Sequence, residues 1–415
     1  MSVQISKKHV YWILFLVFVM ALTVRAGYML SEVGVDTPLQ GDEPEYQGYA
    51  VSFLQGEGWH NGPRYSTRAP LTSLLLVGVY RVTGIDTRAA RWAMVVVSAL
   101  AAPAVFVLGQ LIFDDRWRLP LVASLFWVFY PPSVFYAGMI LTENLAALLI
   151  VLGVAGFLWS SRTGRIAPAA FTGALWAAGA LNRPFALLVP CAFLIGQLLV
   201  RKKNPWPWAR SQWLVGLAAF IIVMAPWTIR NYRIHHVFMP ATSYGGIMIS
   251  STNANLDNPV VQAGSYYHDP QIRRYIQSQP EALWNSVGLR ITLDHVRQNM
   301  GLFLRAVVNR AKSFWTPRPD PYDPSWTLND WLMTAVWVPT LILYAASFRW
   351  LPWRRDWPGL AMILYAFRVP LPFWGTPRFR YPIDPLIILR AVAGLAGVVL
   401  WVGRRLGVRG ALAGR

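Results

Sequence analysis

The sequence is poor in cysteine and in charged side chains. Its 415 residues include one cysteine, Cys191, and 14% of them are charged, whereas an average soluble domain carries about a quarter. One cysteine excludes an intrachain disulfide and a cysteine cluster for a metal. Because Cys191 lies in the apolar run Phe185 to Val200, we expect it to be a small core residue.

The sequence also lacks the common motifs of nucleotide-binding and metal-dependent enzymes. It has no H-E-x-x-H, no glycine-rich phosphate loop and no metal-ligand spacing among its histidines. No soluble segment has the βαβ pattern that a nucleotide-sugar enzyme would need. The sequence therefore indicates no particular cofactor, although it does not decide whether a divalent metal takes part.

Acidic residues are scarce relative to basic ones. There are 19 Asp and Glu against 38 Lys and Arg, which gives a net charge of +19. Such a charge could suit nucleic acid, but the basic residues form short clusters between apolar runs rather than one polar face. This placement is typical of a protein embedded among membrane lipids, and we expect no nucleic-acid partner.

Long apolar runs are what the sequence does contain, since 55% of the residues are hydrophobic. Ten runs are long enough, or nearly so, to cross a bilayer core of about 30 Å. An eleventh, Pro70–Val82, is shorter and suits an interfacial or re-entrant helix. We predict an all-α polytopic membrane protein whose ten spans are Val10–Leu30, Trp92–Phe113, Leu119–Tyr136, Glu143–Trp159, Ile166–Leu181, Pro184–Val200, Gln212–Trp227, Trp331–Phe348, Trp357–Phe373 and Leu386–Trp401.

The positive-inside rule gives the topology of these spans. With a cytoplasmic N terminus, every predicted cytoplasmic connection is basic, including Arg201–Arg210. We expect a multi-pass protein of the plasma (inner) membrane with both termini cytoplasmic and its site facing the periplasm or exterior. The predicted parts are a first transmembrane helix (1–30), an external loop with juxtamembrane helices and acids (31–91), transmembrane helices 2–7 (92–228), an extracytoplasmic lobe (229–330), and transmembrane helices 8–10 with a cytoplasmic tail (331–415).

Two acidic motifs fall on the predicted external side. The string G-D-E-P-E-Y contains Asp42 and Glu43, and Glu143 stands in L-T-E-N-L where the fourth span begins. A carboxylate at the membrane surface could accept the proton of an attacking hydroxyl, with a second acid in support. The alternatives are a solvated acidic loop for the first motif, and a helix N-terminal carboxylate with Thr142 as cap for the second.

Arginines on the same side run against the positive-inside trend. They are Arg68 in R-A-P-L, Arg183 in L-N-R-P-F, and Arg378 with Arg380 in P-R-F-R-Y-P. Guanidinium groups bind phosphate oxygens in pairs of hydrogen bonds, so a lipid phosphate would explain them. Contact with lipid headgroups or pairing with the nearby acids is the alternative. Arg230 is a weaker candidate because it follows a helix end, where it could serve as an anchor.

These motifs, taken in order, resemble the GT-C superfamily of membrane glycosyltransferases, in particular bacterial relatives of the protein O-mannosyltransferases and lipid A aminoarabinose transferases. The resemblance rests on D-E-x-x-Y, R-A-P-L, T-E-N-L, N-R-P, P-W-T-I-R-N-Y and P-R-F-R-Y-P. It implies a GT-C-like bundle with external juxtamembrane helices and a small lobe. It also implies an inverting transfer of a sugar from a polyprenyl-phosphate donor to a hydroxyl or other nucleophile of a protein, lipid or glycan.

The same resemblance implies roles for individual residues. Asp42 matches the general base, and Glu43 and Glu143 match supporting acids. Arg68 matches a residue that contacts the donor phosphate, and Arg378 and Arg380 match a basic pair near it.

The remaining substrate-binding candidates are Tyr46, which completes D-E-x-x-Y, with Arg183 and Arg230. The family's G-G-x-N string is altered to G-G-I-M-I-S-S-T-N. A transporter or flippase of lipid-linked sugar is the alternative function, but it should bury its charges at mid-bilayer.

Overall fold

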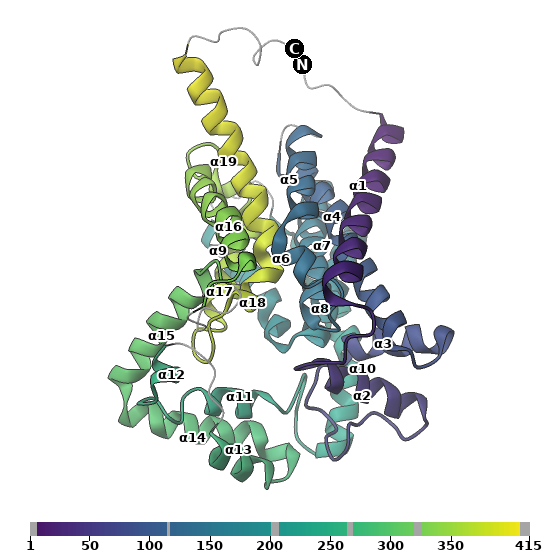
Figure 1. Ribbon diagram of the computed structural model, residues 1–415, viewed down its shortest axis with the longest axis vertical. Helices are drawn as coiled ribbons and strands as arrows, with labels where there is room; N and C mark the ends of the chain where they lie inside the picture. Colours follow the sequence, from purple (N-terminus) through teal and green to yellow (C-terminus); the bar gives the residue numbers. More distant parts are fainter. Residues whose placement is uncertain (1–5, 114–116, 201–206, 264–268, 319–324, 407–415) are drawn as a thin grey trace.

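The computed structural model describes residues 6–113, 117–200, 207–263, 269–318 and 325–406, and all regular structure in these ranges is helical. Figure 1 shows a helical bundle standing on a lobe of shorter helices. The start of α1 (Lys7–Tyr28) and the end of α19 (Asp384–Arg405) both lie at the end of the bundle away from the lobe, on opposite sides of it. We call the opposite end the lobe end. The predicted all-α class is confirmed.

Within the described ranges, five helical segments are long and apolar enough to cross a membrane. They are α1 with the π-helical turn that follows it (Lys7–Val33), α4 (Thr87–Ile112), α7 (Thr142–Thr163), α10 (Arg210–His235) and the C-terminal segment Pro377–Arg405, which joins α18 (Pro377–Arg380) to α19. The expected count of ten spans is therefore not confirmed. The other predicted spans correspond to shorter or less apolar helices, namely α5 (Arg118–Phe129), α8 (Ile166–Asn182), α9 (Val189–Val200), α16 (Leu328–Ser347) and α17 (Trp357–Arg368).

The predicted span Leu119–Tyr136 is broken in two. Pro131 begins a separate helix, α6 (Pro131–Phe135), and Tyr130 before it is extended, as the residue before a proline usually is. The break leaves carbonyl groups at the end of α5 without helical partners. Buried Arg25 of α1 donates to two of them, those of Trp127 and Val128, at 3.4 and 3.3 Å.

Small residues allow the central helices to approach closely. A Cβ atom added to Gly173 of α8 would lie 1.9 Å from the carbonyl oxygen of Gly216 in α10. Glycine is required there because the two backbones are in contact, which is how helices commonly associate in lipid.

One expectation about the bundle is wrong. Cys191 is exposed rather than buried, because α9 turns Val189 and Phe193 inward and leaves its other face, with Ile195 and Leu198, exposed.

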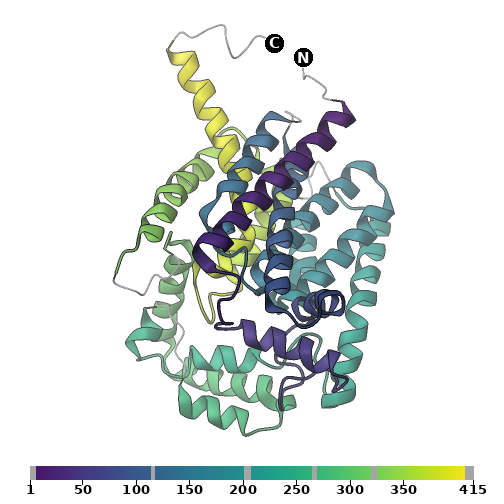
Figure 2. The same ribbon diagram turned by 45° about the vertical axis from the view of Figure 1, so that its right-hand side comes forward.

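Two short helices lie near the lobe at the lobe end of the bundle. The two helices are α2 (Glu43–Leu54) and α3 (Pro70–Thr83), and the lobe comprises α11 (Gly245–Ser251), α12 (Pro259–Gln262), α13 (Pro270–Gln277), α14 (Trp284–Gln298) and α15 (Met300–Trp315). Figure 2 shows the same arrangement after a turn of 45°. α11 packs on α14 with backbones touching, since a Cβ on Gly246 would lie 2.1 Å from the carbonyl oxygen of Trp284.

Candidate active site

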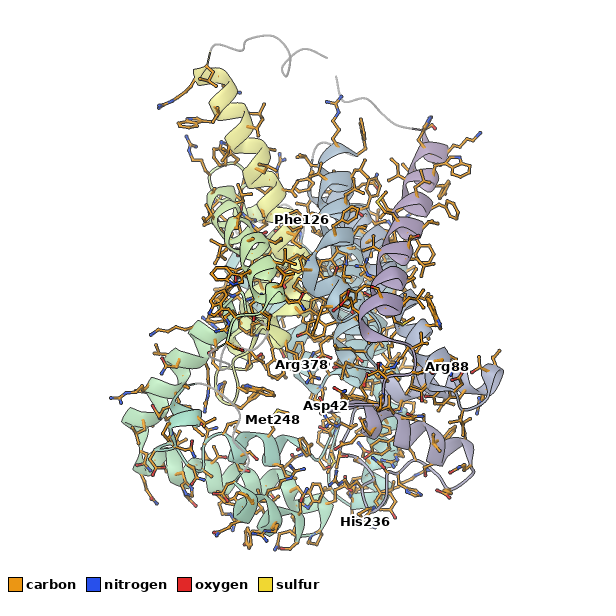
Figure 3. All side chains as sticks on the ribbon, viewed as in Figure 1. Asp42, Arg88, Phe126, His236, Met248 and Arg378 are labelled. Atoms are coloured by element: carbon orange, nitrogen blue, oxygen red, sulfur yellow. The ribbon has the colours of Figure 1, made fainter. Side chains whose placement is uncertain are left out.

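Five predicted site residues meet at the lobe end of the bundle, and each stands at or just beside a helix end. Asp42 precedes α2, Arg68 precedes α3, Glu143 lies in the first turn of α7, Arg183 follows α8, and Arg378 lies in α18. Figure 3 shows Asp42 and Arg378 close together where the bundle faces the lobe. Helix ends are suitable places for such side chains because they are fixed by a rigid element yet open toward the surface.

Asp42 is held between two arginines. Its Oδ1 accepts from Nη2 of Arg68 at 2.7 Å, and its Oδ2 accepts from Nη2 of Arg378 at 2.8 Å. Although Asp42 stands at the N-cap of α2, its carboxylate makes no capping bond. Burial alone would raise the pKa of Asp42, but the charges of Arg68 and Arg378 outweigh burial and leave the pKa below its usual value. Asp42 is therefore ionised at neutral pH.

Glu143 is fully buried and also pairs with arginine. Its Oε1 accepts from Nε of Arg378 and lies 3.3 Å from Nη1 of Arg183. The alternative in which Thr142 caps the helix is wrong, since the N-cap position is Leu141. The Thr142 hydroxyl instead donates to Oε2 of Glu143 at 3.2 Å. Glu143 thus fixes Arg378 beside Asp42.

Arg68 connects Asp42 to a further acid. Its Nε donates to Oε2 of Glu45 at 2.7 Å, and Oε1 of Glu45 lies 3.3 Å from Nη1 of Arg64. The rings of Tyr46 and Tyr244 lie 5.5 and 5.3 Å from the Arg68 guanidinium. The predicted substrate-binding residue Tyr46 is therefore placed against Arg68.

Together these contacts form a continuous row of alternating charge. Four guanidinium groups against three carboxylates leave it one net positive charge. We call it the charge row, and its members in order are Arg64, Glu45, Arg68, Asp42, Arg378, Glu143 and Arg183.

Sequence reasoning did not assign a role to Arg64 or Glu45. Helix periodicity could have found Glu45, because residues i, i+3 and i+4 share a helix face. Asp42, Glu45 and Tyr46 have this spacing and all lie against Arg68.

Glu43, by contrast, lies away from the charge row. It is buried in an ion pair with Arg91 at 3.1 Å and accepts from the backbone N–H of Ile140 at 2.8 Å. Arg91 also donates to the carbonyl oxygens of Thr37 and Gly138. This pair ties the segment before α2 to α4 and to the segment before α7, so Glu43 positions the chain that carries Asp42.

Arg378 and Arg380 do not act as a pair. Arg380 is buried on the opposite side, where Nε lies 3.1 Å from Oδ1 of Asp384 and Nη1 donates to the carbonyl oxygen of Phe314 at 3.0 Å. Its guanidinium also lies 3.6 Å from the ring centre of Trp337. Residues two apart in a helix point about 200° apart, which explains the separation.

Arg230 lies outside the charge row but braces the loop that leads to Arg68. Its Nη1 donates to the carbonyl oxygen of Tyr65 and to the hydroxyl of Ser66, both at 2.8 Å. The lobe holds the same loop through Glu281, which accepts from the backbone N–H groups of Tyr65 and Ser66 at 2.7 Å. Sequence analysis missed Glu281, because nothing local in the sequence relates it to residues more than two hundred positions earlier.

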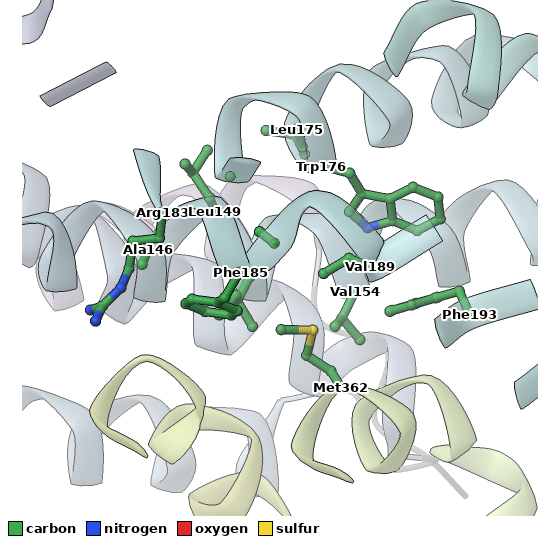
Figure 4. Close-up of a pocket in the computed structure, with 13 residues that line it drawn as sticks. Ala146, Leu149, Val154, Leu175, Trp176, Arg183, Phe185, Val189, Phe193 and Met362 are labelled. Carbon is green, nitrogen blue, oxygen red and sulfur yellow. The ribbon is translucent and has the colours of Figure 1, made fainter. Parts of the chain in front are cut away.

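An apolar pocket begins beside Arg183. Figure 4 shows its lining, in which Arg183 stands at one edge with its guanidinium turned away from the other side chains. Apart from Arg183 the lining is apolar and comes from α7, α8, α17 and the segment from Phe185 to Phe193. It includes Leu149, Trp176, Phe185, Val189, Phe193 and Met362. The site therefore joins a cationic region to an apolar one.

Among the described residues, no three His, Cys, Asp or Glu side chains converge as a metal site. Asp42 and Glu143 converge on the guanidinium of Arg378. A divalent cation bridging these two acids would have to displace Arg378 from both, so the arrangement as it stands does not fit one.

Comparison with known proteins shows likeness only at the level of structure, since no family model and no curated protein matches the sequence. The chain is similar to an oligosaccharyltransferase, AglB from Archaeoglobus fulgidus, in complex with an inhibitory peptide and a dolichol-phosphate. The identity is 14% and the TM-score 0.59, over 99% of this chain and 53% of that one. The apo form of the oligosaccharyltransferase gives 15% and 0.60, over 98% and 53%.

A third similar structure is ArnT from Cupriavidus metallidurans bound to undecaprenyl phosphate, with 14% identity and a TM-score of 0.43 over 93% of this chain and 77% of that one. This chain thus spans about half the length of the oligosaccharyltransferase. Likeness at such identity shows the fold, and it confirms the resemblance suggested by the motifs: this chain has the fold of the GT-C membrane glycosyltransferases.

Proposed function

We propose that this chain is a membrane glycosyltransferase that moves a sugar from a polyprenyl-phosphate carrier to an acceptor nucleophile. The observation that carries the proposal is the position of the Asp42 carboxylate, which lies at the lobe end of the bundle between Arg68 and Arg378. A base beside two phosphate-binding groups is what the transfer of a phosphate-linked sugar requires. The GT-C fold supports the same function.

The donor is a lipid with a phosphate-linked sugar. Arg68, Arg378 and Arg183 supply guanidinium groups for the phosphate, and the charge row has one positive charge in excess to receive it. The apolar pocket beside Arg183 is suited to the isoprenoid units next to the phosphate. The oligosaccharyltransferase of the same fold was solved with a dolichol-phosphate, which is a polyprenyl phosphate without a sugar.

In the proposed reaction, Asp42 accepts the proton of the acceptor hydroxyl, or of another nucleophile, as that nucleophile attacks the anomeric carbon. The bond between this carbon and the phosphate oxygen breaks, and the lipid phosphate leaves with the electron pair. Attack from the side opposite the leaving group inverts the anomeric configuration. Arg68 and Arg378 stabilise the charge that grows on the phosphate, and Glu143 holds Arg378 in place.

The reaction takes place on the external face of the inner membrane. Lys7 and Lys8 at the start of α1, and Arg404 and Arg405 at the end of α19, lie at the end of the bundle away from the lobe. Because basic residues concentrate on the cytoplasmic side, both termini are placed there, and the lobe and the charge row face outside. The acceptor is a protein, a lipid or a glycan.

The test compares cells that make the parent protein, the Asp42→Asn variant, or an Asp294→Asn control whose carboxylate is exposed on α14. Mass spectrometry of glycolipids, glycans and glycoproteins should show one sugar-bearing product in the parent and the control and not in Asp42→Asn. An unchanged product in Asp42→Asn would refute the proposal. The flippase alternative is separated with the purified protein, because a glycosyltransferase cleaves the sugar from its lipid phosphate and changes the mass of the lipid, whereas a flippase only moves the lipid-linked sugar across the bilayer.

A further inference from the structure

Asp42, the proposed general base, has both carboxylate oxygens engaged in hydrogen bonds in this structure. Each oxygen of Asp42 accepts a hydrogen bond from an arginine assigned to the donor phosphate. Resting on the function proposed above, we propose that Arg68 and Arg378 restrain Asp42 until the donor binds, and that the donor's phosphate releases Asp42 by taking over these arginines.

The two arginines contact Asp42 in the same way. Arg68 donates from Nε to Glu45 and from Nη2 to Asp42, and Arg378 donates from Nε to Glu143 and from Nη2 to Asp42. The Nε and Nη2 edge of a guanidinium fits two oxygens of one phosphate. Here that edge is divided between two carboxylates, so a phosphate that binds it in its preferred geometry must displace at least one of them.

Asp42 is the acid in the row that can leave most readily. Glu45 has a second arginine in Arg64, and buried Glu143 has a second one in Arg183. Both of Asp42's arginines are assigned to the phosphate. Both of Glu143's are as well, but Glu143 is fully buried and also accepts a hydrogen bond from the Thr142 hydroxyl. The side chain of Asp42 is also the most exposed of the three, at 29% against 23% and 0%.

The exchange leaves the charge row electrically neutral in a partly buried place. A phosphodiester carries one negative charge, as does the carboxylate that it replaces on the guanidinium groups. Four arginines then face three carboxylates and one phosphate, and the excess positive charge of the row is cancelled. Neutral sugars and neutral acceptors cannot make this exchange, so release depends on the donor.

Release also changes the basicity of Asp42. Burial raises its pKa, and the charges of Arg68 and Arg378 together with their hydrogen bonds hold the pKa below its usual value. When a phosphate neutralises these arginines, the effect of burial remains and the pKa rises. A carboxylate of higher pKa takes a proton more readily. The base thus becomes effective when the donor is in place.

The experiment measures the protonation of Asp42 in the purified full-length protein in nanodiscs. Infrared difference spectra, with Asp42→Asn as the reference, follow its carboxyl band during a pH titration. The probe is the methyl phosphodiester of a polyprenol, which has the donor's phosphate but no sugar, and the free polyprenol is the control lipid. The phosphodiester should move the Asp42 midpoint upward by about one pH unit or more, and the polyprenol should leave it in place.

An Arg378→Gln variant gives an independent check. With one restraint removed, its Asp42 midpoint should already lie higher without lipid, and the phosphodiester should add a smaller shift. An unchanged or lowered midpoint on binding of the phosphodiester overturns the release of Asp42 and leaves the glycosyltransferase proposal standing. If the phosphodiester does not bind at all, both proposals fail.

Discussion

Asp42 is flanked by two arginines and is partly exposed. Replacement by Asn keeps the shape of the side chain and its ability to accept hydrogen bonds but removes its capacity to take a proton. We expect Asp42→Asn to lower turnover by a factor on the order of 10² to 10⁴. Single-turnover kinetics measure this, with Asp294→Asn as control, and full activity in Asp42→Asn would remove Asp42 from the mechanism.

Arg378 and Arg380 should respond differently to substitution. Arg378→Ala removes a charge-assisted contact and should weaken donor binding by about 1.5–3 kcal/mol, with a loss of turnover. Arg380→Ala leaves Asp384 buried without its ion-pair partner, which should cost about 3–5 kcal/mol of stability.

Donor titration and thermal unfolding in detergent separate the two effects. Equal losses of donor affinity in both variants would instead show that Arg378 and Arg380 bind the donor phosphate together, as the sequence suggests.

At the scale of whole elements, the Glu43–Arg91 pair connects three segments of the chain. Glu43→Gln leaves Arg91 buried without its carboxylate, and loss of one partner of a buried pair costs about 3–5 kcal/mol. We expect a lower unfolding temperature, with near-normal turnover in the fraction that stays folded below it. A normal unfolding temperature with strongly reduced turnover would instead make Glu43 a supporting acid of the reaction.

The elements also show what a sequence can reveal. α4 and α7 are predicted well because each is a long uninterrupted apolar run. Pro131 is a local signal for the break between α5 and α6, but Arg25, which donates to the carbonyl groups freed by the break, lies about a hundred residues away, and no local pattern contains that contact.

The same reasoning applies to the site. Arg68 and Arg378 can be predicted because arginines on the external side need a local reason, and Asp42 because it belongs to an acidic motif in an external loop. The partners of Glu43 and Arg380 depend on which way each helix turns its side chains, which only the packed bundle decides.

The two ends of the molecule differ, with the start of α1 and the end of α19 at one end and the lobe at the other. We predict that the lobe faces outside and the end of α19 faces inside, because the basic ends of α1 and α19 should remain in the cytoplasm. Lys202, expected to be inside, lies outside the described residues.

Single cysteines at Ser286 in the lobe and Leu406 after α19 test this in a Cys191→Ser background. A membrane-impermeant thiol reagent applied to intact cells should label the first and not the second. The reverse pattern would overturn the topology and the external site.

The apolar pocket that begins at Arg183 bears on how the protein must be handled. An alkyl phosphocholine detergent consists of a hydrocarbon chain attached to a phosphodiester, the same two features that the pocket and the charge row would recognise. We expect such a detergent to compete with the polyprenyl phosphodiester for binding, whereas an alkyl maltoside of equal chain length should not. The competition should weaken in Arg183→Gln, and equal binding in both detergents would contradict it. A preparation in phosphocholine would then look inert while being fully folded.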